Sequence, residues 1–410
     1  MDYLISRARR RIGQVLRTLV PRNERYRPTS LYSNSLDRPD GPISGGGRYI
    51  EVYPAYTSYL TVPDEFITLA PPYYDRIAEQ EEVAPAFVLL LPEGRLNVDN
   101  HGSVAVISAN NYLVGEASLQ FSVGNFALAP AAKNPIFQQR YFRPPVEVAG
   151  TVCSLLSGGG AAIGNYYHWL LDSLPRLHLV KEAGLWSEID YFLIYSRDQR
   201  FAVETLLALG IRNEQILDVQ SATHLRARLL LVTSPVRGYG RHAPAWVGTF
   251  MKEAFLPQWA GVPHPRRFSP FVYISRRDAA FRRVRNEAEV EALLSEYGFE
   301  SYALTELSFR EKAALFAGAR AVVGPVGAGL VNILFCAPGT PLIELLPRNL
   351  VVPDYLDLTT RLQMPHYPLI SSCEAASAQR ATADRQDDLT VDLGALRQAV
   401  RQALWQPVTT

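Results

Sequence analysis

Short apolar runs alternate with amphipathic segments over much of the chain, and this alternation restricts the fold more than any other feature. Two of the amphipathic segments end at Gly210 and Gly298, where glycine typically stops a helix. Strands this short, separated by helices, favour parallel sheets. We therefore predict an α/β protein with two Rossmann-like domains that face a cleft. The apolar runs lie at residues 191–195, 229–232, 271–274, 321–323 and 342–346.

Composition excludes several classes of protein. The chain has 410 residues, of which 48% are hydrophobic and 20% are charged, so it can fill the cores of two domains and is not a disordered chain. A net charge of +1 gives no overall attraction to nucleic acid. The cysteines Cys153, Cys336 and Cys373 are widely spaced and form no metal-binding motif. We expect a reduced, cytoplasmic protein without a metal ion, and no apolar run is long enough to cross a bilayer.

The N-terminal segment, residues 1–22, has the pattern of an amphipathic helix. Its apolar side chains form a stripe from Leu4 to Leu19, and five arginines lie on other faces: Arg7, Arg9, Arg10, Arg11 and Arg17. This pattern fits a helix at an anionic membrane surface, which would make the protein peripheral on the inner membrane face. The alternative is a helix packed on its own domain, with its arginines in solvent.

The remaining sequence divides into three parts. Residues 23–235 begin with an irregular, β-rich stretch that suggests hairpins at a sheet edge, and we assign them to an acceptor-side α/β domain. Residues 236–380, after a proline-rich crossing, are predicted to form a Rossmann-like nucleotide domain. A polar stretch then precedes a helix within residues 381–410, which we expect to return to the N-terminal domain.

The densest group of chemically active side chains lies at residues 165–176. On a helix, His168 and Asp172 share one face, and an imidazole beside a carboxylate is a plausible general base. Either residue qualifies as the base. The alternative is a purely structural pair that only stabilises the helix. We assign four neighbours to the acceptor side: Asn165, Tyr167, Trp169 and Arg176.

A second group of residues points to an anionic ligand. Arg276 and Arg277 directly follow an apolar run, where a parallel α/β sheet receives anions, and guanidinium groups suit a diphosphate. The alternative is an arginine-rich loop in solvent. A small-residue turn in the same half allows close approach of backbone N–H groups to a phosphate. The turn and its neighbours complete the predicted donor site: Gly327, Ala328, Gly329, Leu330, Asn332 and Glu344.

Two features qualify this donor site. Glu344 would accept hydrogen bonds from a ribose, or else pair with an arginine at the sheet edge. The chain contains no Asp-x-Asp sequence, which commonly holds a metal ion against a nucleotide diphosphate. We therefore expect no cofactor and no metal, with arginine and backbone dipoles meeting the charge of a departing diphosphate.

Taken in order, these motifs resemble glycosyltransferase family 61, over about residues 165–347. The resemblance implies a GT-B architecture, inversion in a single displacement, and a nucleotide-sugar donor, usually a UDP-sugar. It places His168 and Asp172 in the catalytic region, and Arg276 with the turn at Gly327–Leu330 in the donor site. One position departs from the family pattern, because Val326 stands where a histidine is common. Residues 1–150 carry no part of the resemblance.

The sequence thus predicts an inverting, metal-independent hexosyl- or pentosyltransferase for surface polysaccharide biosynthesis. Its partners would be a nucleotide-sugar, a glycan or lipid-linked glycan acceptor, and an anionic membrane surface, without nucleic acid. The alternative, suggested by Val326, is a non-catalytic carbohydrate- or nucleotide-binding protein on the same scaffold.

Overall fold

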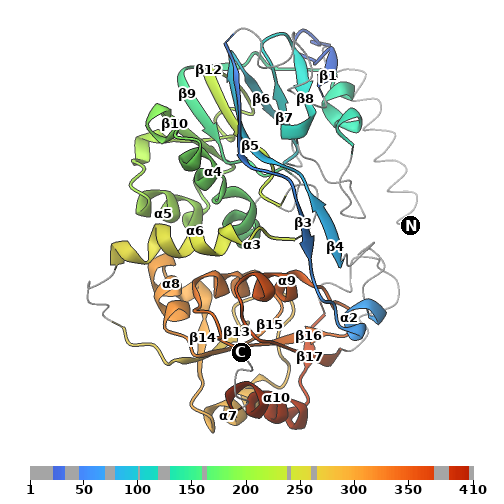
Figure 1. The fold of residues 1–410 in the computed structure, drawn as a ribbon, viewed down its shortest axis with the longest axis vertical. Coiled ribbons are helices and arrows are strands. Elements are labelled where there is room, and N and C mark those ends of the chain that lie inside the picture. The colour runs from blue at the N-terminus through green and yellow to red at the C-terminus, as the bar shows by residue number, and fades with distance from the viewer. Residues whose placement is uncertain are drawn as a thin grey trace, which may run out of the picture.

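The computed structural model describes residues 22–32, 46–69, 79–99, 102–118, 130–158, 164–237, 242–259, 266–373 and 387–405. Two β-sheets lie one above the other along the long axis of the molecule, and a layer of helices fills the space between them (Figure 1). Two further helices cover the outer face of the second sheet. The mixed α/β class predicted from the alternation of apolar runs is confirmed.

The first sheet has ten strands and combines parallel and antiparallel pairing. Its parallel part runs in the order β12-β9-β10-β11, and β5 and β6 pair antiparallel with the two halves of β12. In β10, Phe192 and Leu193 are buried on opposite faces, which explains why this strand reads as a continuous apolar run. The strands are β1 (Ser30–Tyr32), β2 (Arg48–Tyr53), β5 (Ala86–Pro92), β6 (Arg95–Val98), β7 (Val104–Ile107), β8 (Tyr112–Val114), β9 (Val146–Ser154), β10 (Tyr191–Ile194), β11 (Ile216–Asp218) and β12 (His224–Thr233).

The second sheet has the order β14-β13-β15-β16-β17-β18, and every pair is parallel except the last. In chain order its first five strands stand as 2-1-3-4-5, so the winding reverses between β13 and β15, where open α/β sheets bind ligands. The strands are β13 (Phe271–Ser275), β14 (Glu300–Ala303), β15 (Ala321–Pro325), β16 (Leu342–Pro347), β17 (His366–Cys373) and β18 (Leu389–Thr390).

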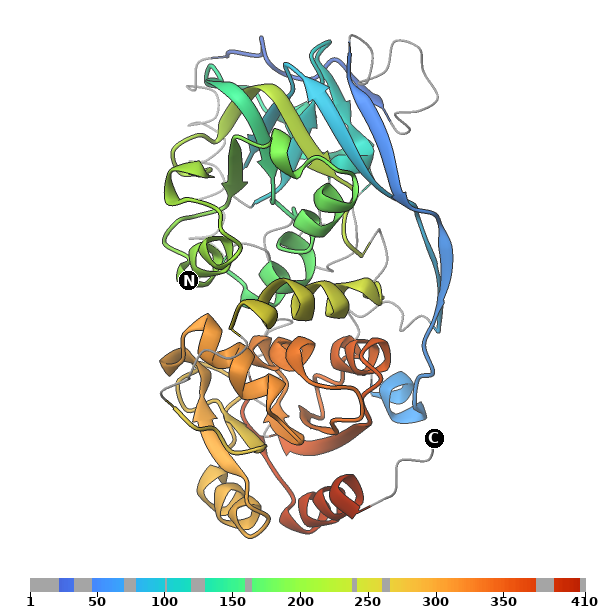
Figure 2. The same cartoon turned by 60° about the vertical axis from the view of Figure 1, so that its left-hand side comes forward.

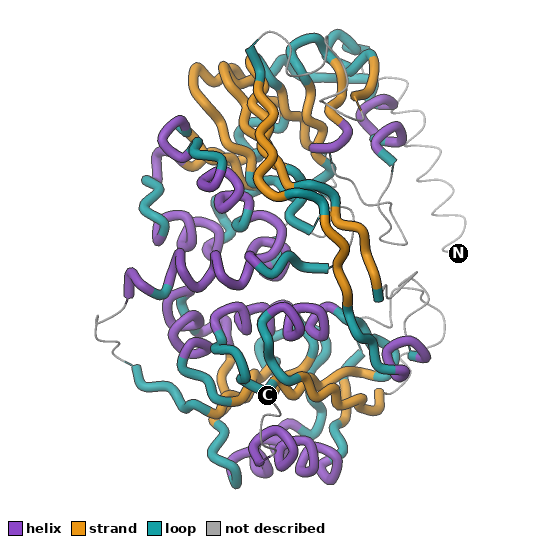
Figure 3. Tube along the Cα trace, in the orientation of Figure 1, coloured by secondary structure: helices purple, strands orange, loops and turns teal. Residues whose placement is uncertain are grey.

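Helices fill the space between the two sheets (Figure 3). They come from two parts of the chain, called here the first half (residues up to 259) and the second half (residues from 266). The first half supplies α3 (Tyr166–His168), a π-helical segment (Trp169–Ser173), α4 (Arg176–Glu182), α5 (Arg200–Ala208) and α6 (Trp246–Phe255). The second half supplies α8 (Phe309–Ala317), the 3₁₀ helix η10 (Ala328–Phe335) and α9 (Asp354–Arg361). On the outer side lie α7 (Glu287–Ser295) and α10 (Leu393–Trp405).

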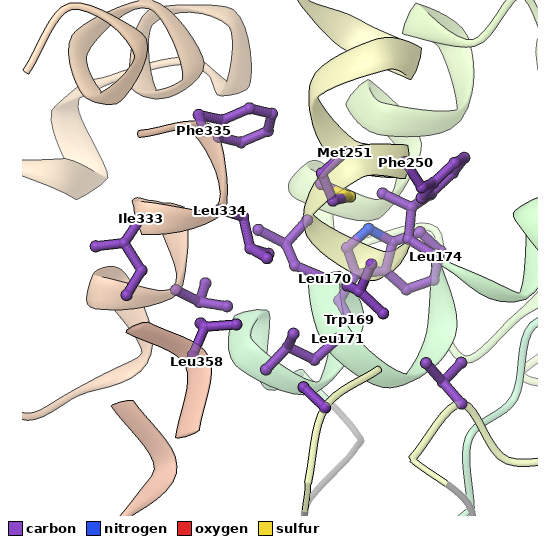
Figure 4. Close-up of a cluster of buried hydrophobic side chains, with 14 of the residues drawn as sticks. Trp169, Leu170, Leu171, Leu174, Phe250, Met251, Ile333, Leu334, Phe335 and Leu358 are labelled. Carbon is purple, nitrogen blue, oxygen red and sulfur yellow. The ribbon is translucent and has the colours of Figure 1, made fainter. Parts of the chain in front are cut away.

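One apolar core joins the two halves. Leu170 and Leu174 from the first half, Met251 of α6, and Leu334 of η10 belong to the same cluster of buried side chains (Figure 4). Burial of apolar surface on this scale is the main favourable term in folding. The relative position of the two sheets is therefore fixed by packing.

An arm of the N-terminal region also reaches the second half (Figure 2). It consists of the hairpin strands β3 (Tyr56–Tyr59) and β4 (Gln80–Val83), with α2 (Asp64–Thr68) in the connection between them. Ser58 accepts a hydrogen bond from Arg361 of α9 at 2.8 Å, and the ring of Phe66 lies 6.1 Å from that of His366. Residues far apart in the sequence thus contact α9 and β17.

The C-terminal helix packs differently from the sequence-based expectation. A helix does form within residues 381–410, as predicted, but it does not return to the first half. Its buried Leu396 and Val400 pack with Leu293 of α7 over the outer face of the second sheet. That face is apolar, and α7 alone leaves part of it for α10 to cover.

Two further predictions concern the N-terminal part and the membrane. The predicted amphipathic helix falls almost wholly on residues 1–21, outside the described residues. Among the helices that the structure describes, none combines the length and the hydropathy that a bilayer crossing requires.

Candidate active site

The segment from Tyr166 to Glu182 turns sharply at its centre. Asn165 caps its start, accepting a hydrogen bond from the Tyr167 N–H at 3.0 Å. The N–H of Leu174 donates to the carbonyl of Trp169 at 2.8 Å, a spacing of five residues that defines a π turn. Pro175 then starts a new helix, α4. π turns of this kind occur frequently at functional sites.

His168 and Asp172 are in direct contact, and a third residue joins them. The Nδ1 atom of His168 lies 2.7 Å from Oδ2 of Asp172. Arg237, in the loop after β12, donates from Nε to Oδ1 at 2.8 Å and from Nη2 to Oδ2 at 2.9 Å. The exposed fraction of the side chain is 20% for His168, 15% for Asp172 and 13% for Arg237. Both oxygens of Asp172 are therefore engaged in a site that is largely shielded from water.

The charges in this cluster decide which member can accept a proton. Burial by itself raises the pKa of Asp172, but Arg237, followed by His168, outweighs burial and holds this pKa well below its usual range. Asp172 consequently remains a carboxylate at neutral pH. Nδ1 of His168 faces Asp172, while Nε2 has no hydrogen-bond partner among the described residues. Within the pair, His168 is thus the residue with a nitrogen available for a proton.

The tyrosines next to His168 connect its segment to the second half of the protein. The hydroxyl of Tyr166 donates to Oδ1 of Asn332 at 2.7 Å, and that of Tyr167 donates to Asp354 at 3.3 Å. The ring of Tyr167 lies edge-on to Tyr355, with centroids 5.9 Å apart. Polar contacts across the apolar layer therefore fix the position of His168 relative to η10 and α9.

Arg276 and the small-residue turn meet where the winding of the second sheet reverses. Arg276 follows β13, Gly327 lies just past β15, and a Cβ atom at Gly327 would overlap the guanidinium of Arg276. Tyr355 donates its hydroxyl hydrogen to the carbonyl of Gly327. Burial, followed by repulsion from Arg282, lowers the pKa of Arg276 to about 10, so the side chain is still a cation at neutral pH. A cation and a close-approach turn therefore meet at one edge of the sheet.

Other residues of the predicted donor site point elsewhere. Arg277 is half-exposed and pairs with Glu291 at 3.5 Å. Glu344 has no exposed surface and lies 2.9 Å from Nε2 of His366, and burial raises its pKa. This placement leaves no surface of Glu344 for a ribose, and its partner is a histidine in place of the arginine considered from sequence.

The turn itself is built mainly from backbone. Gly329 packs so closely that an added Cβ would lie 2.9 Å from Leu304, and Leu330 is buried in the shared core. Asn332 is buried and binds the carbonyl of Gly329 as well as Tyr166. Ala328 is the first residue of η10 and keeps part of its surface exposed.

Two residues assigned to the acceptor side are structural. Trp169 is buried and donates from Nε1 to Thr205 at 2.9 Å. Arg176 is buried as well, donating to the carbonyl of Asp172 at 2.9 Å and to Thr233. Trp169 thus ties the segment to α5, and Arg176 ties it to the end of β12. Tyr167 remains at the site, while Asn165 acts through its helix cap.

Sequence reasoning missed Arg237 and Tyr355. Arg237 comes five residues after the apolar run 229–232, so the rule that singled out Arg276, an arginine just past a strand, applies to it as well. Tyr355 carries no such signal, since its contact with Gly327 joins segments 28 residues apart.

Comparison with known proteins agrees with this geometry. Residues 166–343 match the family model Glycosyltransferase 61. The chain contains a glycosyltransferase 61 domain. A comparison with curated proteins finds no match. The glycosyltransferase domain includes His168, Asp172, Arg237, Arg276 and Gly327, and it identifies the protein as an enzyme that transfers glycosyl groups. In the part of the chain that the structure describes, no group of three or more metal-ligating side chains is found.

The depressed pKa of Asp172 predicts a pH-dependent contribution to stability. A carboxylate whose pKa is lower in the folded state stabilises the fold above its unfolded pKa, about 3.9, and loses that contribution as the pH falls below it. At pH 7, Asp172→Asn should lower the free energy of unfolding by about 3–5 kcal/mol, because it leaves Arg237 without its counter-charge.

Urea unfolding from pH 7 down to pH 3 measures this effect, and the gap between variant and wild type should narrow below about pH 4. Glu188→Gln is the matched control, since Glu188 pairs with Arg48 at the surface and should change stability by less than about 1 kcal/mol. A constant gap at all pH values would show that Asp172 is not held as an ion.

Proposed function

We propose that the protein is an inverting, metal-independent glycosyltransferase that moves a sugar from a nucleotide-sugar, a UDP-sugar, to a glycan acceptor. One observation carries the proposal. His168, oriented by an ionised Asp172, is linked to the turn at Gly327 through its neighbour Tyr167, whose ring contacts Tyr355, and through the hydrogen bond from Tyr355 to Gly327. With the base on one side of these two tyrosines and the anion-binding turn on the other, the arrangement suits an acceptor hydroxyl on one side of a sugar and a diphosphate on the other.

In this mechanism His168 is the general base. The acceptor hydroxyl gives its proton to Nε2 of His168 while its oxygen attacks the anomeric carbon. The bond from that carbon to the diphosphate oxygen breaks, and the diphosphate leaves with the electron pair, which inverts the anomeric centre. Asp172 holds the ring through Nδ1 and stabilises the imidazolium that forms. The choice between His168 and Asp172 that the sequence left open thus falls on His168.

The leaving diphosphate would be stabilised by the second half. Arg276 supplies a cation, and the turn from Gly327 to Gly329 supplies backbone N–H groups at the start of η10. Val326 is buried at the end of β15, so the role of the histidine common at this position passes to these groups. Because the charge is met by arginine and backbone, the proposed reaction needs no metal.

Further parts of the proposal concern architecture and setting. Two sheets with a layer of helices between them, and the parallel order of the second sheet, support a GT-B arrangement. We propose that the acceptor belongs to surface polysaccharide biosynthesis, free or lipid-linked, and that the enzyme acts in the cytoplasm.

We also propose that residues 1–20 hold the enzyme on an anionic inner membrane surface. The arginines opposite the apolar stripe supply the attraction. Flotation with anionic liposomes should fall as salt is raised, because the charges are then screened, and should disappear when residues 1–20 are deleted. If the protein that lacks residues 1–20 floats equally well, the apolar stripe from Leu4 to Leu19 packs against its own domain instead of the membrane.

Gly327→Ala tests the donor site. The new methyl group overlaps the tip of the flexible Arg276 side chain, so the guanidinium must move while the fold is kept. The backbone of Gly327 is extended, with φ at 168°, and accepts alanine without strain. UDP affinity, measured by calorimetry, should fall by about 1.5–3 kcal/mol, the range for a hydrogen bond to a charged group, as it should in Arg276→Ala.

Gly318→Ala is the matched control, because the nearest atom to its new Cβ lies 3.5 Å away. Unchanged UDP binding in a folded Gly327→Ala and in Arg276→Ala would remove both residues from the donor site.

Turnover, assayed in excess EDTA, tests the base. His168→Ala should lower kcat by about 10²- to 10⁴-fold with UDP affinity nearly intact, and the double variant with Asp172→Asn should be little worse, since the two act as a unit. Near-normal turnover per folded molecule in both single variants would end the assignment.

Loss of wild-type activity in EDTA would contradict the metal-free mechanism. If the protein binds UDP but neither transfers sugar nor hydrolyses the donor, the result would favour the alternative of a non-catalytic carbohydrate- or nucleotide-binding protein.

A further inference from the structure

Of the three side chains in contact at His168, Asp172 and Arg237, only Arg237 has no counterpart in the sequence-based prediction. It lies in the loop after β12, on the first sheet, whereas His168 and Asp172 lie on the π-turned segment below that sheet. Its guanidinium reaches both oxygens of Asp172, at 2.8 and 2.9 Å, in a fork that lysine cannot reproduce. The same group stacks over the ring of Tyr167, 5.6 Å from its centroid.

This position determines the net charge that His168 experiences. The charges of Asp172 and Arg237 cancel as long as both hydrogen bonds between the guanidinium and the carboxylate are formed. A second carboxylate, Asp354, is linked to the site through the hydroxyl of Tyr167. The groups that face His168 or contact its partner are Tyr167 and Asp172 on its own segment, Arg237 after β12, Arg176 on α4, and Asp354 and Tyr355 on α9.

Without Arg237, the shielded imidazole would adjoin a carboxylate that has lost its ion-pair partner and both guanidinium hydrogen bonds. A negative charge at 2.7 Å in a site of low polarity strongly favours imidazolium. An imidazolium cannot accept a proton from the acceptor hydroxyl. A carboxylate that orients the histidine would in that case also disable it at neutral pH.

We propose that Arg237 is a positioning residue that fixes the Asp172 carboxylate and balances its charge, so that Asp172 orients His168 without leaving a net negative charge beside the imidazole that acts as the base. Arg237 touches neither donor nor acceptor in this scheme and acts only through Asp172. Its stacking on Tyr167 also ties the fork to the tyrosine that contacts α9, so the base is aligned with the second half of the site. The role in turnover rests on the proposed function, whereas the protonation of His168 does not.

The test measures the protonation of His168 directly. The full-length protein is labelled at the histidine Cε1 position, the His168 signal is assigned by its loss in His168→Ala, and its NMR shift is followed from pH 4 to 9. In Arg237→Gln the midpoint of this titration should rise by about 1 pH unit or more, the usual effect of one nearby charge. Arg237→Lys keeps the charge, so its midpoint should stay near that of the wild type.

A double variant distinguishes the proposed route from a general effect. In Asp172→Asn/Arg237→Gln the carboxylate is gone as well, so the rise should disappear. An unchanged midpoint in folded Arg237→Gln would overturn the proposal, as would a rise that persists in the double variant. If Arg237→Gln does not fold, the lysine and double variants decide, and a raised midpoint in either of them overturns the proposal.

The pH dependence of turnover then tests the functional consequence. The acid limb of kcat/KM should move to higher pH in Arg237→Gln by the same amount as the NMR midpoint, and Arg237→Lys should restore it while kcat stays reduced, because a single ammonium does not fix both oxygens. Arg197→Gln, an exposed arginine whose contacts lie in another loop, is the matched control. If the NMR midpoint moves as expected but the wild type transfers no sugar, the proposed function fails and the role of Arg237 in the protonation of His168 stands.

Discussion

The apolar layer between the two sheets is the constraint on which the rest of the structure depends. Side chains from the π turn after α3, from α6 and from η10 belong to one buried cluster (Figure 4). A layer packed to the density of a protein interior holds its surfaces in a defined register. The few polar groups that cross it, such as Tyr166 with Asn332, are then held at fixed distances. The alignment of His168 with Arg276 and with the turn at Gly327–Leu330 is a consequence of this packing.

The same layer gives the charged groups their effect. Asp172 and Arg237 are shielded from water by the helices around them, so their interaction is stronger than that of an exposed ion pair. A buried ion pair is weak evidence for stability, because the loss of hydration offsets much of the attraction. Its value here lies in chemistry, since the pair fixes the state of a carboxylate next to a histidine. Arg176, behind the turn, supports the same arrangement through the Asp172 carbonyl.

Several features of the fold and of the site follow from local sequence. The helix within residues 381–410 and the glycine stops after α5 and α7 are properties of neighbouring residues and were predicted correctly. The capping box of Ser308 with Glu311 is a local feature of the same kind. The contact between His168 and Asp172 was predictable for the same reason, since four residues make one helical turn. The resemblance to glycosyltransferase family 61, confirmed over residues 166–343, also rests on short ordered motifs.

The sequence by itself therefore determined the α/β class, the elements near the site, and the pairing of His168 with Asp172, because periodicity, caps and one-turn spacing act over a few residues. The tertiary structure alone decided that α10 packs beside α7, that Trp169 and Arg176 face inward, and that Glu344 is buried against His366. It also decided that Arg237 reaches Asp172 across 65 positions of the chain, and Tyr355 reaches Gly327 across 28. Such contacts depend on which surfaces the shared core brings together, and no local pattern encodes that choice.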